Sequence, residues 1–598
     1  MDLDIVTYDL EVYTNYFDAA FLNTKTNQVQ HFELMDEQTF SPEVVKRIMK
    51  IMKTAQVVGF NSLNYDLPVL SLALQGATPK QLKALSDKII DERKKYWMHD
   101  HELIKAPNHI DIIEVAPGRK SLKDYSGCLH APKMQDLPIE PSAIISNDDA
   151  ALLRKYCEND LYNTYYLYQA LSDQIDLRRE MSEMYGKDLR SKSDAQIAEV
   201  VIRDGVSFRS QDKLSKPEPC PGFEFQYDAP DFLTFKHPSL VNAFNVITKA
   251  TFVVNIKGSV NLPKPIEDLK IEVGNSKYTV GIGGLHSKEH QVAHHSDEEH
   301  VLIDRDVASY YPSLILNGNY GPPHLAPHFM DVYRSLVDRR LAAKHAGDKV
   351  TADSLKITIN GTFGKMGSQY SLLYAPKQLI QTTLTGQLSL LMLIEMLEAE
   401  GIAVVSANTD GVVVKCPRDL TAILELIIWE WEARTGLKTE ETIYKSVYSR
   451  DVNNYIAMKE NGEFKLKGAY APTSLSKNPA SSIVVKAVLQ FLESNTPIAK
   501  TITSCTDIRM FLNVRKVKGG AIDQDGKLIG KSIRWYYSTE IEDPIRYAVN
   551  NYKVPLTEGA RPLMELPDSF PTDINYTWYI DKAEKVLGEI AATGAKAA

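Results

Sequence analysis

The sequence is poor in cysteine and has no long apolar run, and both absences limit what the protein can be. Its 598 residues include only five cysteines, and no two of them form a C-x-x-C pair, which argues against a zinc site or a disulfide framework. No run of about 18 apolar residues is present, so no transmembrane helix is expected. The first residues, Met-Asp-Leu-Asp-Ile, are acidic where a secretory signal is basic. We therefore expect a cytoplasmic protein.

The chain also lacks an overall basic excess, although one stretch of it is strongly basic. The formal net charge of −9 would by itself argue against a nucleic-acid partner. Residues 464–537, however, hold 12 Lys plus Arg against 4 Asp plus Glu, a local net charge of +8. Such a stretch is a candidate footprint for a phosphate backbone. The alternative is an ordinary solvated surface, which most charge runs form.

Length and hydrophobic periodicity predict several domains of mixed α/β structure. A chain of 598 residues exceeds what one hydrophobic core supports. Ile5–Val12 and residues 57–60 are strand-like and Ala150–Leu171 is helical, a pattern typical of an α/β domain. The small-residue tail 591–598 is expected to be frayed. Further predicted helices are Ser193–Arg203, Asp331–His345, Thr351–Gly361 and Leu388–Glu400, and further predicted strands are Val301–Ile303, Ala403–Ala407, Val412–Lys415, Tyr455–Lys459 and Glu463–Lys467.

Three short blocks carry the strongest chemical signal. They are Asp306-Val-Ala-Ser-Tyr-Tyr-Pro-Ser313, Lys356-Ile-Thr-Ile-Asn-Gly-Thr-Phe-Gly364 and Asn408-Thr-Asp-Gly411. Asp306 ends a strand-like segment, and Asp410 lies in a hairpin signalled by Asp-Gly, so two carboxylates on neighbouring strand ends can hold two metals. Alone, Asp306 could cap the next helix and Asp410 could merely make a turn. Together with a Lys-bearing helix between them, they indicate phosphoryl transfer from a nucleotide.

The helical block places three side chains on one face. Lys356, Asn360 and Phe363 are spaced i, i+4 and i+7. Lys356 can therefore reach a triphosphate, while Asn360 and Phe363 can border the nascent base pair. Arg340 and Lys344 on the preceding helix are also i, i+4 and add candidate phosphate contacts, with ordinary solvated charge as the alternative.

A second acidic set lies near the N-terminus. Asp9 and Glu11 are two apart on a strand, so both carboxylates face the same way. Asn61-Ser-Leu-Asn-Tyr-Asp66 adds a third acid, and Tyr156-Cys-Glu-Asn-Asp160 adds a fourth on a helix. Four carboxylates around two metals can generate a hydroxide and cleave a phosphodiester. Each pattern alone is weak, because D-x-E is common by chance.

In order and spacing, the three blocks resemble motifs A, B and C of family B DNA polymerases, and the resemblance covers nearly the whole chain. Motif A, D-x-x-S-L-Y-P, is matched by Asp306, Ser309, Tyr310, Tyr311 and Pro312. Motif B, K-x-x-x-N-S-x-Y-G, is matched by Lys356, Asn360, Phe363 and Gly364, with Gly361 in place of Ser. Motif C, D-T-D, is Asn408-Thr409-Asp410 here, so the family's main metal ligand is kept and the first Asp is an amide. The resemblance implies metal ligands at Asp306, Val307 and Asp410, and it makes Tyr311 the steric gate that rejects a 2′-hydroxyl.

Weaker matches follow the motifs. Tyr455, in Asn453-Asn-Tyr-Ile-Ala457, resembles the segment that grips the primer end. Lys465 and Lys467, which share one face of a strand, resemble the basic strand that tracks a DNA backbone. Gly281-Ile-Gly-Gly284 resembles the Tyr-x-Gly-Gly segment that links exonuclease and polymerase. The basic C-terminal stretch would then be a DNA-binding thumb, with contacts at Arg515, Lys516 and Lys518.

The N-terminal acidic set resembles the family's Exo I, Exo II and Exo III motifs. By that resemblance Asp9, Glu11, Asp66 and Asp160 are metal ligands, and Tyr156 orients the attacking water. Lys123 is a candidate contact for the substrate phosphate, with a surface charge as an equally good alternative. The implied cofactors are two Mg²⁺ ions at each of the two sites, with Mn²⁺ as a substitute.

The resemblance implies an α/β multidomain fold, with an RNase H-like exonuclease domain and a right-hand polymerase made of palm, fingers and thumb. The expected domains are an exonuclease (1–171), a connecting region with the start of the palm (172–280), the palm with motif A (281–330), the fingers with motif B (331–384), the palm with motif C and the following hairpin (385–467), and the thumb with the C-terminal tail (468–598).

We interpret the chain as a compact DNA-dependent DNA polymerase with 3′→5′ proofreading, and its small size suggests a bacteriophage origin and the host cytoplasm. The expected partners are primer–template DNA, deoxynucleotides and other replisome proteins, with no membrane, and the expected state is a monomer. Only 50 residues separate Asp306 from Lys356, which leaves no room for the insertion that contacts terminal protein in protein-primed relatives. A nucleic-acid primer is therefore favoured, with terminal-protein priming as the alternative. Two rivals remain: a non-catalytic replication factor, supported by Asn408, and a stand-alone exonuclease with a vestigial C-terminal half.

Overall fold

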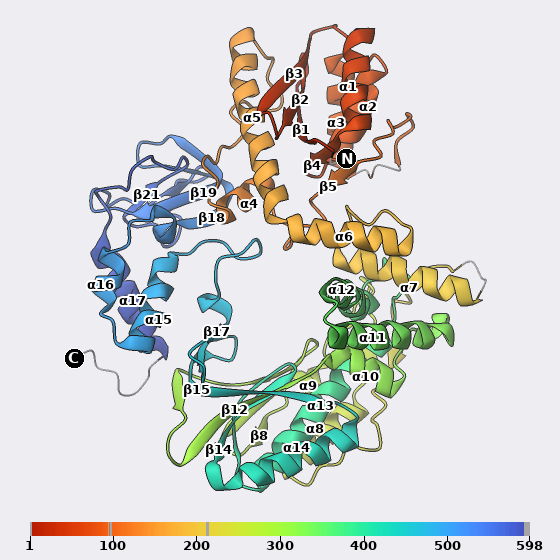
Figure 1. Cartoon of the computed structure of the whole chain (residues 1–598), viewed down its shortest axis with the longest axis vertical. Coiled ribbons are helices and arrows are strands. Elements are labelled where there is room, and N and C mark those ends of the chain that lie inside the picture. The colour runs from red at the N-terminus through yellow and green to blue at the C-terminus, as the bar shows by residue number, and fades with distance from the viewer. Residues whose placement is uncertain (1–2, 94, 96–97, 211–213, 591–598) are drawn as a thin grey trace. The chain divides into compact units, whose positions relative to one another are not determined.

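The structure is a computed structural model that describes residues 3–93, 95, 98–210 and 214–590. It divides into two compact units (Figure 1). Unit 1 comprises Met1–Ser193 and Pro472–Ala583, and unit 2 comprises Asp194–Ala471 and Glu584–Ala598. Both units contain helices and sheets, which confirms the mixed α/β multidomain class. The tail 591–598, expected to be frayed, lies outside the described residues.

Unit 1 begins with a mixed five-stranded sheet. Its strands follow the order β3-β2-β1-β4-β5, in which β1, β2 and β3 are antiparallel neighbours while β4 runs parallel to both β1 and β5. The predicted first strand is confirmed residue for residue. The strands are β1 (Ile5–Val12), β2 (Tyr16–Asn23), β3 (Gln28–Met35), β4 (Gln56–Gly59) and β5 (His109–Asp111).

One long helix of unit 1, α5 (Asn147–Ala170), packs on β1 and β2 and bears out the predicted helix over 150–171. The Ser146 side chain accepts a hydrogen bond from the backbone N–H of Asp149, and the Asp149 carboxylate accepts one from the backbone N–H of Ser146, so a capping box fixes where this helix begins. The other helices of this part are α1 (Pro42–Thr54), α2 (Asp66–Leu74), α3 (Pro79–Glu92), α4 (Leu122–Cys128) and α6 (Ser172–Tyr185).

The C-terminal part of unit 1 is a second sheet with three helices. Its strand order is β20-β18-β19-β21, and the short helix α4 packs on both β18 and β19. The elements are α15 (Ser482–Ser494), α16 (Ile498–Thr503), β18 (Asn513–Ile522), β19 (Leu528–Tyr537), β20 (Arg546–Tyr547), β21 (Ala560–Pro562) and α17 (Tyr576–Ile590), the last of which begins in this unit.

Unit 2 is built on a ten-stranded antiparallel sheet. The main path runs β17-β16-β15-β12-β14-β13-β10-β9-β8, and β11 pairs with β15. The strands are β8 (Ile271–Val273), β9 (Ser276–Val280), β10 (Leu285–Ser287), β11 (Val292–His295), β12 (His300–Val307), β13 (Ala403–Asn408), β14 (Gly411–Pro417), β15 (Thr439–Asp451), β16 (Asn454–Lys459) and β17 (Phe464–Leu466). A separate pair joins β6 (Glu224–Phe225) and β7 (Phe252–Val253).

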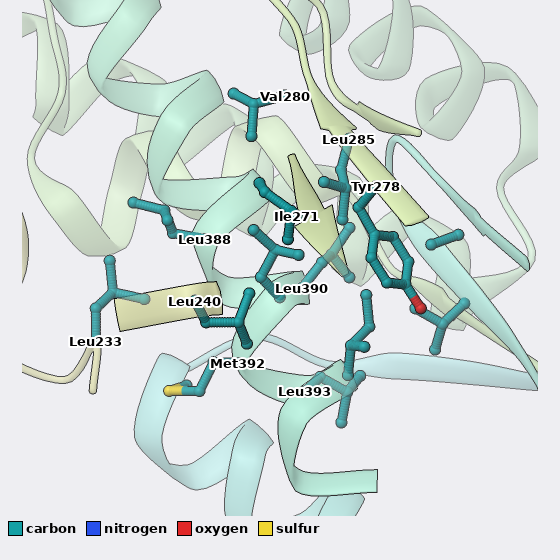
Figure 2. Close-up of a cluster of buried hydrophobic side chains, with 14 of the residues drawn as sticks. Leu233, Leu240, Ile271, Tyr278, Val280, Leu285, Leu388, Leu390, Met392 and Leu393 are labelled. Carbon is teal, nitrogen blue, oxygen red and sulfur yellow. The ribbon is translucent and has the colours of Figure 1, made fainter. Parts of the chain in front are cut away.

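The core of unit 2 lies between this sheet and three helices, α8 (Pro238–Lys249), α13 (Pro376–Ala399) and α14 (Thr421–Thr435). Figure 2 shows side chains of α8, β8, β9 and α13 meeting there. Helix α13 is long and apolar enough to cross a membrane, but 83% of its most apolar stretch is buried inside the structure. Buried core helices pass the same test of length and composition, so α13 is weak evidence for a membrane span.

A further helical group of unit 2 carries the second sequence block. Helix α12 (Lys349–Met366) packs against α7 (Asp194–Ser210) and α11 (His328–Ala346), and α10 (Tyr310–Gly318) contacts α11, α12 and α13. A short helix, α9 (Lys264–Glu267), lies beside α8. At Gly361 a Cβ would lie 2.9 Å from the carbonyl oxygen of Asp194 on α7. This close helix contact explains why glycine stands where motif B usually has serine.

The two tryptophans of α14 allow a matched test of this core. The Trp431 side chain is fully buried and its indole N–H donates to the Ser389 carbonyl at 2.7 Å, whereas Trp429 is 69% exposed. We expect Trp431→Ala to lower the free energy of unfolding by about 3–5 kcal/mol, and Trp429→Ala to change it by less than about 0.5 kcal/mol. Urea denaturation followed by circular dichroism measures both, and equal effects would contradict this packing.

Candidate functional sites

The strand register of unit 2 brings the two predicted polymerase acids together. Asp306, near the end of β12, pairs with Gly411, the first residue of β14. Asp410 immediately precedes Gly411, and its carbonyl accepts a hydrogen bond from the backbone N–H of Val307 at 2.7 Å. Both carboxylates line the same two cavities. The predicted placement of two acids on neighbouring strand ends is therefore observed.

The turn that carries Asp410 differs slightly from the expected Asp-Gly turn. Asn408 pairs with Gly411, so the two turn residues are Thr409 and Asp410, and Gly411 already belongs to β14. Thr409 has a φ of 50°, which is strained for a β-branched residue. Glycine is needed at 411 for a different reason than the turn: a Cβ there would lie 2.9 Å from the Arg305 carbonyl and 3.1 Å from Asp306 Oδ1.

Burial disfavours the ionised forms of both acids, and at Asp306 repulsion by Asp410 adds to this effect. Partial burial and then the neighbouring Asp410 raise the pKa of Asp306 to about 6. Burial also raises the pKa of Asp410, which Lys467 and Lys465 partly offset. Two acids that repel one another in a partly buried site are stabilised by a bound divalent cation, so this donor set fits the implied metals.

One cavity of about 840 Å³ gathers the predicted nucleotide-binding residues of unit 2. It extends from the two acids to the exposed faces of α11 and α12. The whole predicted set lines it: Asp306, Val307, Tyr311, Arg340, Lys344, Lys356, Asn360, Phe363 and Asp410. The predicted i, i+4 and i+7 face of α12 is thus confirmed as a single surface. The lining also includes Lys349, Asp348, Asp353 and Glu440, so cationic and acidic side chains share the cavity, as recognition of a metal-bound triphosphate requires.

Two aromatic rings form part of the wall of this cavity. The rings of Tyr311 and Phe363 stack with centroids 4.1 Å apart and planes 9° from parallel. The Tyr311 hydroxyl donates to the carbonyl of Gly283, in the Gly281–Gly284 segment. Both the ring and the hydroxyl of Tyr311 are therefore fixed in place, as a steric gate would require. Arg340, which also lines the cavity, donates to Ser309 Oγ at 2.8 Å.

A second cavity of about 360 Å³ adjoins the same two acids. Tyr455, Lys465 and Lys467, predicted as DNA contacts, all line it. Lys465 departs from the prediction of a backbone-tracking lysine, because its ammonium donates inward to the buried Asp304 carboxylate at 2.9 Å. Burial lowers and Asp304 raises the pKa of Lys465, and the net shift is upward, so it stays charged.

Asn408, the departure from motif C, has a structural partner. Its side-chain N–H donates to the Val452 carbonyl at 3.2 Å, and its oxygen accepts from the Thr409 hydroxyl at 3.1 Å. An ionised aspartate has no proton to donate to Val452. The amide therefore joins the motif C turn to the segment before β16.

In unit 1 the predicted exonuclease acids converge between β1, α2 and α5. Ligand atoms of Asp9, Glu11 and Cys157 all lie within 4.8 Å of one another. Asp160 is close enough to raise the pKa of Asp9 and Glu11, and Asp9 in turn raises the pKa of Asp66. All four predicted acids therefore belong to one cluster.

The cluster is strongly destabilised when every acid is ionised. Burial and then Asp160 raise the pKa of Asp9 to about 8, and burial raises the pKa of Glu11 and of Asp66 well above their usual range. Asp160 Oδ1 is buried and meets no hydrogen-bond donor among the described residues. An orphaned carboxylate oxygen beside three further acids fits divalent cations as the missing partners.

Lys123, on α4, lies inside this site and not on the surface. Its ammonium donates to the Tyr156 hydroxyl and to Asp160 Oδ2 at 3.2 Å, and its side chain is 20% exposed. The alternative of a solvated surface charge is therefore wrong. Lys123 also lowers the pKa of Asp9 and Glu11, so it favours the ionised cluster.

The remaining predicted basic residues lie on β18 of unit 1. Lys516 and Lys518 are exposed and Arg515 is half-buried. The Arg515 guanidinium donates to the Pro555 carbonyl, and Lys516 lies 3.5 Å from the carboxylate of Asp124 on α4. Their role as DNA contacts stays a prediction.

Sequence patterns did not identify three residues that complete these sites. Cys157 is the neighbour of Tyr156 but belongs to no metal-binding spacing. Asp111 accepts hydrogen bonds at 2.9 Å from the backbone N–H groups of Asn61 and Leu63, and so anchors the loop that leads to Asp66. Asp304 is two residues before Asp306 on the same strand, and this i, i+2 spacing was the one available signal.

Comparison with known proteins finds a family match in unit 1 that includes Asp66 and Asp160 but begins after Asp9 and Glu11. Residues 16–191 match a family model described as a predicted 3′-5′ exonuclease related to the exonuclease domain of PolB. The chain therefore carries a PolB-related exonuclease domain of RNase H-like fold, and domains of this kind use divalent metals. This result supports the resemblance to a family B polymerase with an exonuclease.

Among solved structures, the chain is similar to the family B DNA polymerase from the hyperthermophilic archaeon Pyrobaculum calidifontis. The sequence identity is 14%, the TM-score is 0.42, and the alignment covers all of this chain and 79% of that one. No curated protein matches the sequence.

The position of Lys123 predicts how the exonuclease depends on pH. Removing its charge in Lys123→Met raises the pKa of Asp9 and Glu11 further, so protons compete with cations up to a higher pH. We expect the acidic midpoint of the pH–rate profile for single-strand cleavage to move to higher pH, with a loss of about tenfold at pH 7 for each added pKa unit.

The matched control is Lys155→Met, which removes an exposed lysine from α5 and is expected to leave the midpoint unchanged. A Lys123→Met enzyme with the wild-type midpoint would contradict the proposed electrostatic contact.

Proposed function

We propose that the protein is a DNA-dependent DNA polymerase with 3′→5′ proofreading, which extends a primer during replication of a phage genome. The observation that carries the proposal is the 840 Å³ cavity of unit 2, where Asp306 and Asp410 face Arg340, Lys344 and Lys356. A cluster of acids alone would fit many metal sites. Acids opposite three cations and a stacked aromatic pair fit a metal-bound nucleoside triphosphate.

Each residue of the cavity has a definite task in this reaction. Lys356, Arg340 and Lys344 bind the triphosphate. Asp306 and Asp410, with the backbone of Val307, hold two Mg²⁺ ions, for which Mn²⁺ can substitute. When bound, these ions lower the pKa of the primer 3′-hydroxyl and neutralise the leaving pyrophosphate. The Tyr311 ring, fixed by Phe363 and Gly283, excludes a ribose 2′-hydroxyl, and Asn360 borders the new base pair.

The exonuclease site has a parallel division of tasks. Asp9, Glu11, Asp66 and Asp160 hold two cations, which supply an activated water for phosphodiester cleavage. Burial raises the pKa of Tyr156 well above its usual range, so its phenol remains protonated. Lys123 donates to the phenol oxygen, and a hydrogen bond to Asp160 helps to raise the phenol pKa, so Tyr156 is fixed beside the acids where it can orient the attacking water.

A nucleic-acid primer fits the segment between motifs A and B. Residues 307–355, all of which are described, form the end of β12, α10, a short turn of helix at Pro323–Leu325, α11 and the start of α12. These elements fill the whole interval. Terminal-protein priming would need contacts from other parts of the chain. The other parts of the proposal are primer–template DNA and deoxynucleotides as substrates, replisome proteins as partners, a monomeric state and the host cytoplasm.

Asn408 is the residue that favours the rival function, a non-catalytic replication factor. That residue makes structural hydrogen bonds, while both acids and the phosphate-binding cations remain around one cavity. A stand-alone exonuclease would not need such a cavity. The rivals remain separable by experiment.

A pair of single substitutions tests both activities. We expect Asp410→Ala to reduce primer extension by at least about 100-fold, because a metal site contributes several kcal/mol, while single-strand degradation is unchanged. Asp66→Ala is expected to do the reverse. The measurement is a gel assay of labelled primer–template with Mg²⁺, with and without the four deoxynucleotides.

Each variant is the control for the other, because each must keep the activity of the intact site. If wild-type protein only shortens the primer in both lanes, extension of a nucleic-acid primer is wrong, and an exonuclease or a protein-primed enzyme that needs its own starter is left. If neither substitution affects either activity, both site assignments are wrong.

A further inference from the structure

The second cavity of unit 2 contains a charged pair that the proposed chemistry does not use. Asp304 lies on β12, two residues before Asp306, and is only 6% exposed. Its Oδ2 accepts hydrogen bonds from the Lys465 ammonium at 2.9 Å and from the Tyr444 hydroxyl at 2.6 Å. The pair connects β12 to β17 at the far edge of the sheet, and Tyr444 contributes from β15, the neighbour of β12.

The position of the Lys465 ammonium is the feature of this pair that needs an explanation. Its side chain is about one-third exposed to the cavity that Asp306 and Asp410 also line. An ammonium on a flexible four-carbon stem has three donors and can pair with either carboxylate. In that position it would compete directly with divalent cations, because it would neutralise the same charges.

The observed contacts hold the Lys465 ammonium at Asp304. Lys465 Nζ is bonded to Asp304 and lies 5.9 Å from the centroid of the Tyr444 ring. Tyr444 is almost fully buried and its hydroxyl is fixed by the same Asp304 oxygen, so acid and ring form one rigid receptor for the ammonium. Moving the ammonium away would leave the buried Asp304 carboxylate without its positively charged partner, which is unfavourable.

We propose that Asp304 is a positioning residue that holds the Lys465 ammonium against Tyr444 and so prevents it from pairing with Asp306 and Asp410. The inference rests on the proposed function, since it concerns access of divalent cations to that site. Asp304 Oδ2, the oxygen that holds the lysine, already accepts two hydrogen bonds.

A double-mutant cycle tests this role through Mn²⁺ binding to the full chain, measured by electron paramagnetic resonance. The background is Asp9→Ala/Glu11→Ala, so that binding reports unit 2 alone. Asp304→Asn keeps the shape and the acceptor for Tyr444 but removes the charge that holds Lys465. We expect it to weaken Mn²⁺ binding at least about threefold, and Asp304→Asn/Lys465→Met to return within about twofold of the background protein.

The other outcomes overturn the proposal in distinct ways. If Asp304 were itself a metal ligand, adding Lys465→Met would not restore binding. If Asp304 only stabilised the sheet, Asp304→Asn would lower the melting temperature without changing Mn²⁺ affinity. The matched control is Glu463→Gln, which removes the acid partner of Lys459 on the same β16–β17 hairpin and is expected to leave binding unchanged.

Primer extension by the wild-type protein separates this inference from the proposed function. If the wild-type protein extends primers but adding Lys465→Met to Asp304→Asn does not restore Mn²⁺ binding, only the role of Asp304 is overturned. A cycle with the expected rescue in a protein that does not extend primers would support the role of Asp304 and overturn the proposed function.

Discussion

The repulsion between carboxylates packed side by side is the constraint on which both sites depend. In unit 1, four acids share a buried cluster, and the pKa of Asp9 rises to about 8 through burial and the nearby Asp160. In unit 2, burial and the nearby Asp410 raise the pKa of Asp306 to about 6. Folding alone gains nothing from such clusters, because each buried charge costs free energy without a partner. Such clusters are expected where cations complete them, and in unit 1 Lys123 moderates the repulsion by lowering the pKa of Asp9 and Glu11.

The sheets create this proximity by register, and the surrounding backbone is adapted to it. In unit 2, Asp306 and Asp410 meet because β12 and β14 pair so that Gly411 faces Asp306. A side chain at 411 would press on Asp306, so glycine is required there even though its φ is ordinary. Thr409 accepts a left-handed φ in the same turn. In unit 1 the corresponding device is Asp111, whose carboxylate holds the loop that delivers Asp66. A strained turn in unit 2 and a buried anchor in unit 1 thus lie beside the two candidate sites.

Much of this could be predicted from the sequence, because it follows from local periodicity. The strand Ile5–Val12, the helix of Asp160, the two helices around Lys344 and Lys356, and the hairpin of Asp410 all have clear patterns, and the structure contains each of them. Long-range contacts have no such signal. The partner of Lys465 is Asp304, 161 residues earlier, and Lys123 meets Asp160 across a helix interface. Gly361 stands in place of the motif B serine, and the close approach of α7 explains it.

Domain order along the chain proved a poor guide to which parts pack together. The segment Pro472–Ala583, expected as part of the thumb, belongs to the same compact unit as the exonuclease acids. Its strands hold α4 closely: Ser532 donates to Asp124 at 2.6 Å, and a Cβ on Gly127 would clash with Val514 at 2.6 Å. The buried Arg534 adds a hydrogen bond to the Ala131 carbonyl at 2.7 Å. Because α4 also carries Lys123, the C-terminal strands support the exonuclease site from outside the region, residues 16–191, that matches the exonuclease family. The geometry of that site is therefore a property of the whole unit rather than of its N-terminal domain alone.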